Sequence, residues 1–310
     1  MIKVYVPPIE KFELNEDYGE INHVLKDGLR KNSKTELVKS YEECDYVFAD
    51  FRHLIPERTG YTGDLRTFDS NKLIVIDYSD RAELYDIDCL HYFKRSSVNK
   101  GQGRFREYPK KIHHISYCIK NKWLDFNVKK NKKRDIDISV FFRERGQRVK
   151  GGMYNREVVA SFVKQTFSDK NIWVGIADKD GEEGRINMGS DYVDKMLNSK
   201  IVVNCNPDHW EGDYRLFESL SCGPLVLVDH MITPVKNPFE NNKHLGYYGS
   251  LEELRAMIND YLHFEETRKD VAYNGYKYSL EHHTTSNRID EILEVIEDGK
   301  KQTKQKKTTG

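Results

Sequence analysis

Short apolar runs recur through the first 120 residues and are separated by polar segments. Runs of this length, bounded by polar turns, are typical of strands buried on both faces of a parallel sheet. Between the first two runs, Ile21, Val24, Leu25 and Leu29 recur at helical spacing and predict a helix with one apolar face. Strands alternating with helices predict a parallel α/β domain. The predicted strands are Ile2–Val6, Glu36–Val38, Tyr46–Ala49, Leu73–Asp77, Leu90–Phe93 and His114–Tyr117.

The pattern changes at residues 127–134 (NVKKNKKR), which are polar and basic with no apolar face. Since neither aromatic residues nor a second basic stripe accompany these lysines, a solvated linker is favoured over a DNA-binding segment. A second α/β pattern then begins. Its predicted strands are Ile136–Phe142, Asn171–Ala177, Lys200–Pro207, Leu225–Val228 and Leu245–Tyr248. Its predicted helices are Arg156–Phe167, Tyr192–Ser199, Arg215–Cys222, Ser250–Phe264 and Thr285–Ile296.

These patterns predict two α/β domains, at residues 1–130 and 135–284. The helix at 285–298 is expected to pack back on the N-terminal domain. Residues 299–310 are Lys-rich and contain no apolar side chain, so a disordered tail is expected there.

Composition excludes several classes of protein. The 310 residues carry 50 Lys and Arg against 50 Asp and Glu, so the overall charge indicates neither nucleic acid nor an anionic membrane as a partner. No apolar run approaches the roughly 18 residues of a membrane span, and the N-terminus has no signal-peptide pattern. A cytoplasmic protein is expected. The cysteines show no C-x-x-C spacing and are expected to be reduced and buried: Cys44, Cys89, Cys118, Cys205 and Cys222.

The segment DYRLFESLSCGPLVLVD, residues 213–229, is the most informative one. It follows a strand-like run and predicts a helix capped by Asp213 and ended by Gly223, then a buried strand. The helix N-terminus would lie at the carboxyl edge of the sheet, where α/β folds bind ligands. Arg215 and Glu218 share a helix face. An arginine can clamp a phosphate and a carboxylate can accept hydrogen bonds from ribose hydroxyls. A nucleoside-diphosphate site is predicted here, with Asn206, Asp213, Tyr214, Arg215 and Glu218.

A glycine-containing basic loop, RERGQRVKGG, follows the strand Ile136–Phe142. Its glycines let backbone amides approach an anion. Neither a dinucleotide fingerprint nor a Walker A loop is present. Arg143, Arg145 and Gly146 are therefore predicted to help neutralise a leaving diphosphate, although a plain solvated loop is the simpler alternative.

The run Y-x4-L-x-S-K-I-V-V-N at Tyr192–Asn204, with the segment after it, resembles the donor-binding half of GT-B glycosyltransferases. The resemblance is closest to the exostosin-like and CgeB-like groups, with similar compact enzymes in large DNA viruses of algae. It implies two Rossmann-like domains whose parallel sheets face a central cleft, with the sugar donor bound by the C-terminal domain and the acceptor by the N-terminal one. It also implies a hexosyl- or pentosyltransferase that takes a nucleoside-diphosphate sugar, UDP-sugars being favoured, to a hydroxyl of a glycan or glycoprotein. Neither a cofactor nor a metal is expected.

Inverting transfer needs a general base that accepts the proton of the acceptor hydroxyl. Partial shielding from water suits a carboxylate to that task, because desolvation raises its pKa. Asp80, just after the strand Leu73–Asp77, is the first candidate, followed by Asp50 and Glu83.

Two alternatives remain open. Asp178 and Asp180 form a D-x-D that resembles the metal site of GT-A glycosyltransferases, although the same spacing at Asp86–Asp88 and Asp135–Asp137 shows how common it is. The other alternative is a non-catalytic module that binds a nucleotide or a glycan.

Overall fold

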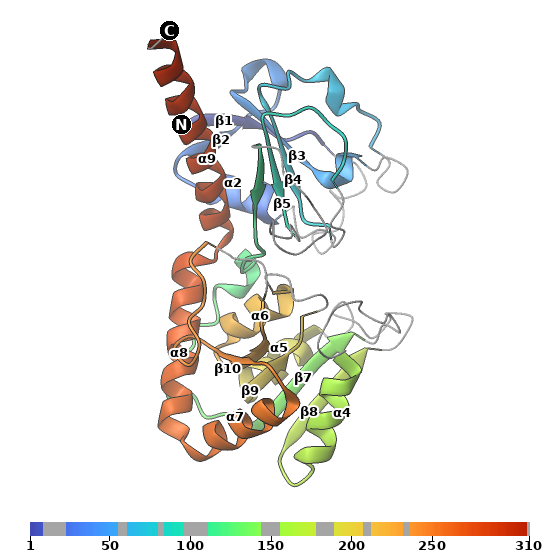
Figure 1. Ribbon diagram of the computed structural model, residues 1–310, viewed down its shortest axis with the longest axis vertical. Coiled ribbons are helices and arrows are strands. Elements are labelled where there is room, and N and C mark those ends of the chain that lie inside the picture. The colour runs from blue at the N-terminus through green and yellow to red at the C-terminus, as the bar shows by residue number, and fades with distance from the viewer. Residues whose placement is uncertain are drawn as a thin grey trace. The chain divides into compact units, whose positions relative to one another are not determined.

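The structure of the protein is a computed structural model that describes residues 1–8, 23–54, 61–79, 84–95, 111–143, 156–177, 189–206, 212–231 and 236–308. The chain forms two compact units (Figure 1). The N-terminal unit comprises Met1–Asn121 and Thr284–Gly310, and the C-terminal unit comprises Lys122–His283. Each unit has its own sheet, as the alternation of strands and helices predicted.

The N-terminal sheet has the strand order β2-β1-β3-β4-β5-β6, and every neighbouring pair is parallel. The strands β3 and β4 are buried at every position, as their apolar runs predicted. The bounds are β1 (Ile2–Tyr5), β2 (Thr35–Leu37), β3 (Tyr46–Asp50), β4 (Leu73–Asp77), β5 (His91–Lys94) and β6 (Ile112–His114).

The last predicted strand of this sheet, His114–Tyr117, was placed too late, because β6 ends at His114. Ile115 and Tyr117 are nevertheless buried. Tyr117 stacks on Tyr78 with 5.4 Å between ring centroids. The apolar residues of this segment are therefore explained by burial against neighbouring side chains and not by a strand.

Helical segments of the N-terminal unit come from both ends of the chain. A π-helical turn, His23–Gly28, continues into α2 (Leu29–Lys31), where a helix was predicted. The long helix α9 (Thr285–Thr308) packs against this turn and α2 (Figure 1). Arg288 Nε on α9 donates a hydrogen bond of 3.1 Å to the Tyr117 carbonyl. Short 3-10 helices lie at Tyr41–Glu43, Phe51–Leu54, Leu65–Thr67 and Asn121–Trp123.

The helix α9 continues through residues 299–308, where the sequence analysis expected a disordered tail. Lys and Gln are good helix formers even without an apolar face, and cations are favourable near a helix C-terminus. An ion pair of 3.1 Å between Lys301 Nζ and Asp298 Oδ1 lies on this part of the helix.

The C-terminal sheet has the order β11-β10-β9-β7-β8 and is also parallel throughout. The strands are β7 (Ile136–Arg143), β8 (Ile172–Ala177), β9 (Ser199–Asn204), β10 (Leu225–Asp229) and β11 (Gly246–Tyr248). The helices are α4 (Arg156–Thr166), α5 (Gly189–Asn198), α6 (Tyr214–Cys222), α7 (Leu251–His263) and α8 (Glu265–His282).

The helix α8 was not predicted from the sequence. Its buried face includes Ala272, Gly275 and Ser279, which are small or polar and give little hydrophobic periodicity. A Cβ added to Gly275 would lie 1.9 Å from the His244 carbonyl oxygen. The helix therefore packs closely against a neighbouring backbone, and Val271 and Ala272 join the hydrophobic core of the unit.

Candidate active site

The helix α6 lies between the parallel strands β9 and β10, so its N-terminus is at the carboxyl edge of the C-terminal sheet. Asp213 caps it, since Oδ1 accepts a hydrogen bond of 3.2 Å from the Leu216 amide. At the other end Gly223 adopts φ +73° and its amide donates to the carbonyls of Ser219 and Leu220. All nine residues of α6 are buried. The predicted strand–helix–strand unit and both of its caps are confirmed.

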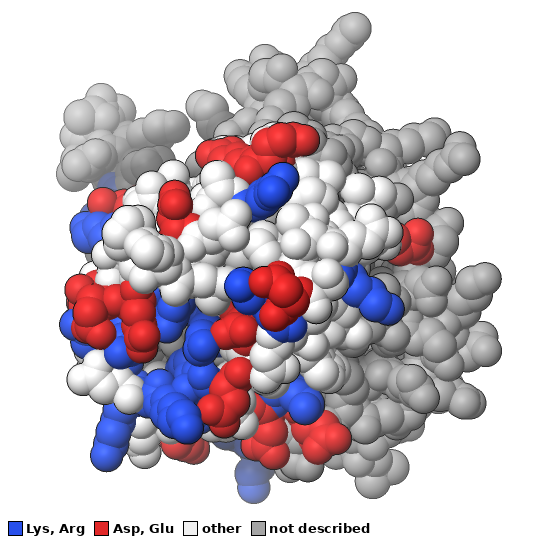
Figure 2. All heavy atoms as spheres, turned by 90° about the horizontal axis from the view of Figure 1, so that it is seen from below, with Lys and Arg blue, Asp and Glu red and all other residues white. Residues whose placement is uncertain are grey.

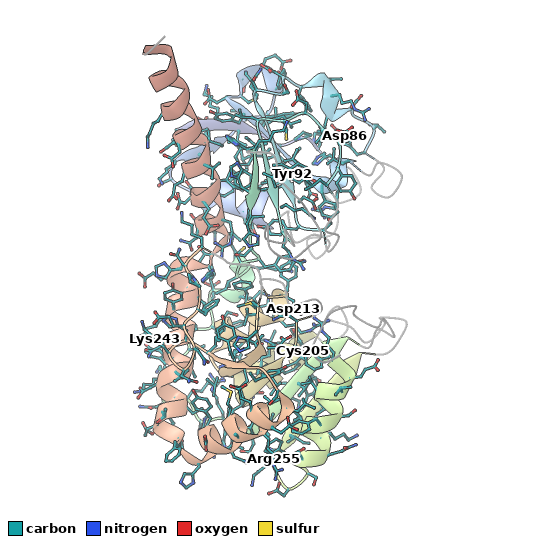
Figure 3. All side chains as sticks on the ribbon, in the orientation of Figure 1. Asp86, Tyr92, Cys205, Asp213, Lys243 and Arg255 are labelled. Atoms are coloured by element: carbon teal, nitrogen blue, oxygen red, sulfur yellow. The ribbon has the colours of Figure 1, made fainter. Side chains whose placement is uncertain are left out.

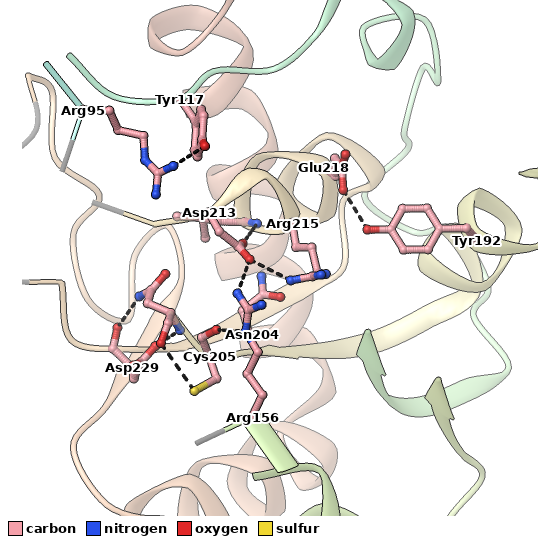
Figure 4. Close-up of polar contacts among 12 residues, drawn as sticks. Arg95, Tyr117, Arg156, Tyr192, Asn204, Cys205, Asp213, Arg215, Glu218 and Asp229 are labelled. Carbon is pink, nitrogen blue, oxygen red and sulfur yellow. Dashed lines mark hydrogen bonds and ion pairs between the residues drawn. The ribbon is translucent and has the colours of Figure 1, made fainter. Parts of the chain in front are cut away.

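Asp213 also binds two arginines (Figure 4). Its Oδ2 accepts hydrogen bonds from Arg156 at 2.6 Å and from Arg215 at 2.8 Å. All three side chains are at least 80% buried. Among these described groups, two guanidinium charges and the positive end of α6 face one carboxylate. Guanidinium groups beside a helix N-terminus are an arrangement that suits an anion at this edge of the sheet.

Arg156 is a site residue to which the sequence analysis gave no role. It is the first residue of α4, and its Nε donates a 3.0 Å hydrogen bond to the Cys205 carbonyl at the end of β9. Its guanidinium therefore ties α4 to both β9 and the cap of α6. The two residues that Arg156 contacts, Cys205 and Asp213, are labelled in Figure 3. One feature of the sequence could have indicated this role. Arg156 is the first residue of the helix that follows the glycine-containing loop, and loops after the strands of an open α/β sheet commonly bind ligands.

Glu218, one turn further along α6, is buried with its carboxylate held by Tyr192 (Figure 4). The Tyr192 hydroxyl donates a 2.7 Å hydrogen bond to Oε2. The Tyr192 ring packs edge-on against Trp123 and Phe141, at 6.0 and 5.2 Å between centroids. A carboxylate can accept about four hydrogen bonds, so Glu218 has the capacity to accept ligand hydroxyls as well.

Two asparagines lie at the carboxyl end of β9, Asn204 as its last residue and Asn206 two residues after it. The Asn206 amide donates to Asp229 Oδ1 at 2.7 Å, which joins the ends of β9 and β10. Asn204 is 2% exposed, and neither polar atom of its side-chain amide has a hydrogen-bond partner in the described part of the chain. Leaving such a group unsatisfied costs about 1–3 kcal/mol. Water or a ligand commonly satisfies groups of this kind in native sites.

The cysteines offer no activated nucleophile. All five are buried and outside disulfides, as the sequence predicted. Burial, and secondarily Asp229, raises the pKa of the Cys205 thiol, which keeps this thiol protonated at neutral pH.

Several predicted site residues lie outside the described residues. These are Asp80, Glu83, Arg145, Gly146, Asp178 and Asp180. Arg143 ends β7, but its side chain is not described. Tyr214 is described and is the first residue of α6, where it is buried.

Asp50, the second candidate for the base, ends β3 in the N-terminal unit and is buried. Its Oδ2 pairs with Arg52 NH2 at 2.6 Å. Burial raises the pKa of Asp50, and Arg52 opposes that rise. Asp77, at the end of β4, is likewise held by Lys94 at 3.1 Å and by the Tyr92 hydroxyl at 2.7 Å. Both carboxylates therefore already take part in buried ion pairs.

Comparison with solved structures identifies this architecture. The sucrose-phosphate synthase of Thermosynechococcus elongatus superposes with a TM-score of 0.54 at 8% identity, over 96% of this chain and 100% of that chain. HepE of Anabaena, solved with UDP and glucose, gives a TM-score of 0.55 at 10% identity, over the same shares of the two chains. This chain has the GT-B fold. At these identities the likeness concerns the fold.

Residues 157–294 match the model of a family described as glycosyl transferase-like. The matched stretch contains Tyr192, Asp213, Arg215 and Glu218, and it begins one residue after Arg156. A comparison with curated proteins returns no match. The family match covers less than half of the chain, and the solved structures show its fold. Among the described helices, none is both long and apolar enough to cross a bilayer.

Proposed function

We propose that the protein transfers a sugar from a nucleoside-diphosphate sugar, with UDP-sugars favoured, to a hydroxyl of a glycan or glycoprotein. The proposal includes transfer with inversion, no metal, a cytoplasmic location, and a place among the exostosin-like or CgeB-like enzymes. One observation carries it. At the N-terminus of α6, Asp213 holds Arg156 and Arg215 together, and Glu218 lies one turn further along the same helix.

In this proposal the arginines act on the leaving group. As the anomeric C–O bond breaks, its electron pair passes to the diphosphate. Arg215, Arg156 and the amides at the start of α6 stabilise that charge without reorganising. Arg143, Arg145 and Gly146 are proposed to contribute to binding the same diphosphate. The HepE structures with UDP and with UDP-glucose support uracil as the base and a hexose as the sugar.

Glu218 binds the nucleotide ribose in this proposal, by accepting hydrogen bonds from its hydroxyls. Tyr192 fixes the carboxylate from the other side, at 2.7 Å. A buried carboxylate with a fixed orientation loses little entropy on binding, which favours affinity. Asn204, whose side-chain amide has no partner among the described residues, and Asn206 are further polar groups proposed to bind the nucleotide.

Asp80 is the proposed base. It would accept the proton of the acceptor hydroxyl while that oxygen forms its bond to the anomeric carbon. Asp50 is the less favoured base, because Arg52 already pairs with it.

Calorimetry with a panel of UDP-, GDP-, ADP- and dTDP-sugars in EDTA tests the proposal on the wild type and on Glu218→Ala. One donor is expected to bind without metal, with the variant weaker by about 1–3 kcal/mol. Glu252→Ala, an exposed carboxylate on α7, is the matched control and should bind like the wild type.

Equal binding by Glu218→Ala and the wild type would contradict the site. A strict requirement for metal would point instead to Asp178 and Asp180. Donor binding without transfer to any acceptor in a panel of glycans would indicate a non-catalytic nucleotide-binding module.

A further inference from the structure

A polar pocket lies at the edge of the C-terminal sheet opposite to the proposed donor site, where the strands begin. Its volume is about 360 Å³. It is lined by residues 128–134, which lead into β7, by Lys200 near the start of β9, by Gly223 just before β10, and by the first half of α8. We call it the amino-edge pocket. Since α6 begins at the carboxyl edge, this pocket is separate from the proposed donor site.

The lining is strongly basic. Eight lining residues are Lys or Arg and one is a carboxylate, Glu265. The basic residues are Lys129, Lys130, Lys132, Lys133, Arg134, Lys200, Arg268 and Lys269.

The basic segment at residues 128–134 is anchored at both ends, which a solvated linker would not be. Val128 is 8% exposed, and its amide donates to the Tyr276 hydroxyl at 3.3 Å. Arg134 donates to the carbonyls of Leu197 and Cys222, at 2.7 and 3.0 Å, near the C-termini of α5 and α6. Lys129, Lys130 and Lys133 are exposed, as a solvated segment predicts. The two anchored ends, which the sequence did not indicate, fix where this segment lies along the wall of the pocket.

Part of the positive charge is already neutralised. Lys130 pairs with Asp270, Lys200 with Asp137 at 2.6 Å, and Lys269 with Glu265 at 2.8 Å. The ammonium groups of Lys129 and Lys132, by contrast, form no hydrogen bond or ion pair with any residue that the structure describes. These two cations are available to a ligand.

The positive charges in the lining also disfavour the protonated forms of their neighbours. Burial, and then the charge of Arg134, lowers the pKa of Lys132. Burial lowers the pKa of Arg134 to about 10 and lowers that of Arg268. An anion bound among them would offset this cost, because opposite charge favours the protonated forms.

The charge and size indicate a phosphate group. A phosphate monoester carries nearly two charges and three strong acceptor oxygens, which suit several ammonium groups. The start of α8, an 18-residue helix, supplies Glu265, Arg268 and Lys269 to the lining. The volume is within the range of small-molecule sites.

A nucleic acid fits less well. On the face seen in Figure 2, Lys and Arg are interleaved with Asp and Glu, whereas nucleic-acid binding is indicated by a stripe of positive charge. We infer that the amino-edge pocket binds a phosphate group, carried either by a soluble small molecule or by a lipid headgroup.

Calorimetry with inorganic pyrophosphate in about 0.15 M salt tests this inference. The pocket variant is Lys129→Gln/Lys132→Gln. The control is Lys164→Gln/Lys170→Gln, which removes the same charge from exposed residues of the same unit outside the pocket. The pocket variant should lose one binding component or weaken it about tenfold or more, and the control should retain it.

The comparison isolates the pocket even if pyrophosphate also binds at α6, because Arg215 and Arg156 are unchanged in both variants. The pocket variant should bind nucleotide sugars like the wild type, so failure of this inference and failure of the proposed function are distinguishable. Equal pyrophosphate binding by the pocket variant and the wild type, or equal losses in both variants, would overturn the inference.

Vesicles containing phosphatidic acid distinguish the two sources of phosphate. Co-sedimentation of the wild type, competed by pyrophosphate and lost in the pocket variant, would assign a lipid headgroup. Pyrophosphate binding without co-sedimentation would assign a soluble ligand. Binding to neither probe would rule the site out.

Discussion

Arg156 joins three parts of the C-terminal unit through one side chain. It reaches the Cys205 carbonyl with Nε and the Asp213 carboxylate with a terminal nitrogen. A planar guanidinium can make two such bonds in fixed directions, whereas a lysine ammonium is a point charge on a flexible stem. The geometry, beyond the charge, is what this position supplies.

Arg156→Lys is therefore expected to be harmful although it keeps the charge. The loss of one hydrogen bond to a charged partner should lower the free energy of unfolding by about 1–3 kcal/mol. Binding of the nucleotide sugar should weaken as well, since Asp213 and Arg215 lose a fixed neighbour. Urea unfolding and calorimetry measure the two effects. Arg255→Lys, on the exposed face of α7, is the control (Figure 3). If Arg156→Lys equals the wild type in both measurements, charge alone matters here.

At the scale of the element, α6 depends on how it ends. Gly223 has φ +73°, and a Cβ there would lie 2.5 Å from Val128 Cγ1. Both the left-handed backbone and the close neighbour exclude a side chain. Gly223 therefore ends α6 and also leaves room for Val128, which anchors the basic segment.

Gly223→Ala should lower the free energy of unfolding by about 2 kcal/mol or more, the left-handed backbone alone accounting for about 1–2 kcal/mol. Gly299→Ala is a matched control that is expected to raise the free energy of unfolding. Its added Cβ would have no neighbour nearer than 3.5 Å, and alanine is the better helix former by up to about 1 kcal/mol. Urea unfolding of both variants checks the pair. An unchanged free energy of unfolding in Gly223→Ala would show that the segment before β7 can move to accommodate the added methyl group.

At the scale of the whole molecule, two histidines on β5 and β6 couple stability to pH. His91 Nδ1 and His113 Nε2 lie 3.0 Å apart. Burial, and secondarily His91, lowers the pKa of His113 to about 4, and burial lowers that of His91. The unfolded chain, with ordinary histidine pKa values near 6.5, therefore binds more protons than the folded chain between pH 4 and 6.5.

Stability should accordingly fall as the pH decreases through this window. For His113 the loss between pH 7 and pH 5 is expected to be about 1 kcal/mol, reduced from a larger full value because the ring is partly exposed. Urea unfolding at the two pH values measures it. His113→Gln should flatten the dependence, whereas His263→Gln, an exposed residue, should leave it unchanged. An identical pH dependence in His113→Gln and the wild type would exclude this histidine as the cause.

Local patterns in the sequence were enough to predict the order and type of most helices and strands. Parallel strands such as β4 and β10 are buried on both faces, so they appear as continuous apolar runs. The caps Asp213 and Gly223 act on residues within one turn of themselves. Features of this kind depend on residues that are close in the sequence, so a single sequence is enough to predict them.

Contacts between side chains that are distant in the sequence could be found only from the folded structure. Arg156 and Asp213 are 57 positions apart, and Tyr192 and Glu218 are 26 apart. Their contacts depend on how helices pack on the sheet, and no local pattern encodes that. The same holds for α8, whose small buried residues match a neighbouring backbone, and for the basic segment at 128–134. Its composition indicated a solvated linker, whereas contacts with residues far along the chain anchor it at the amino-edge pocket.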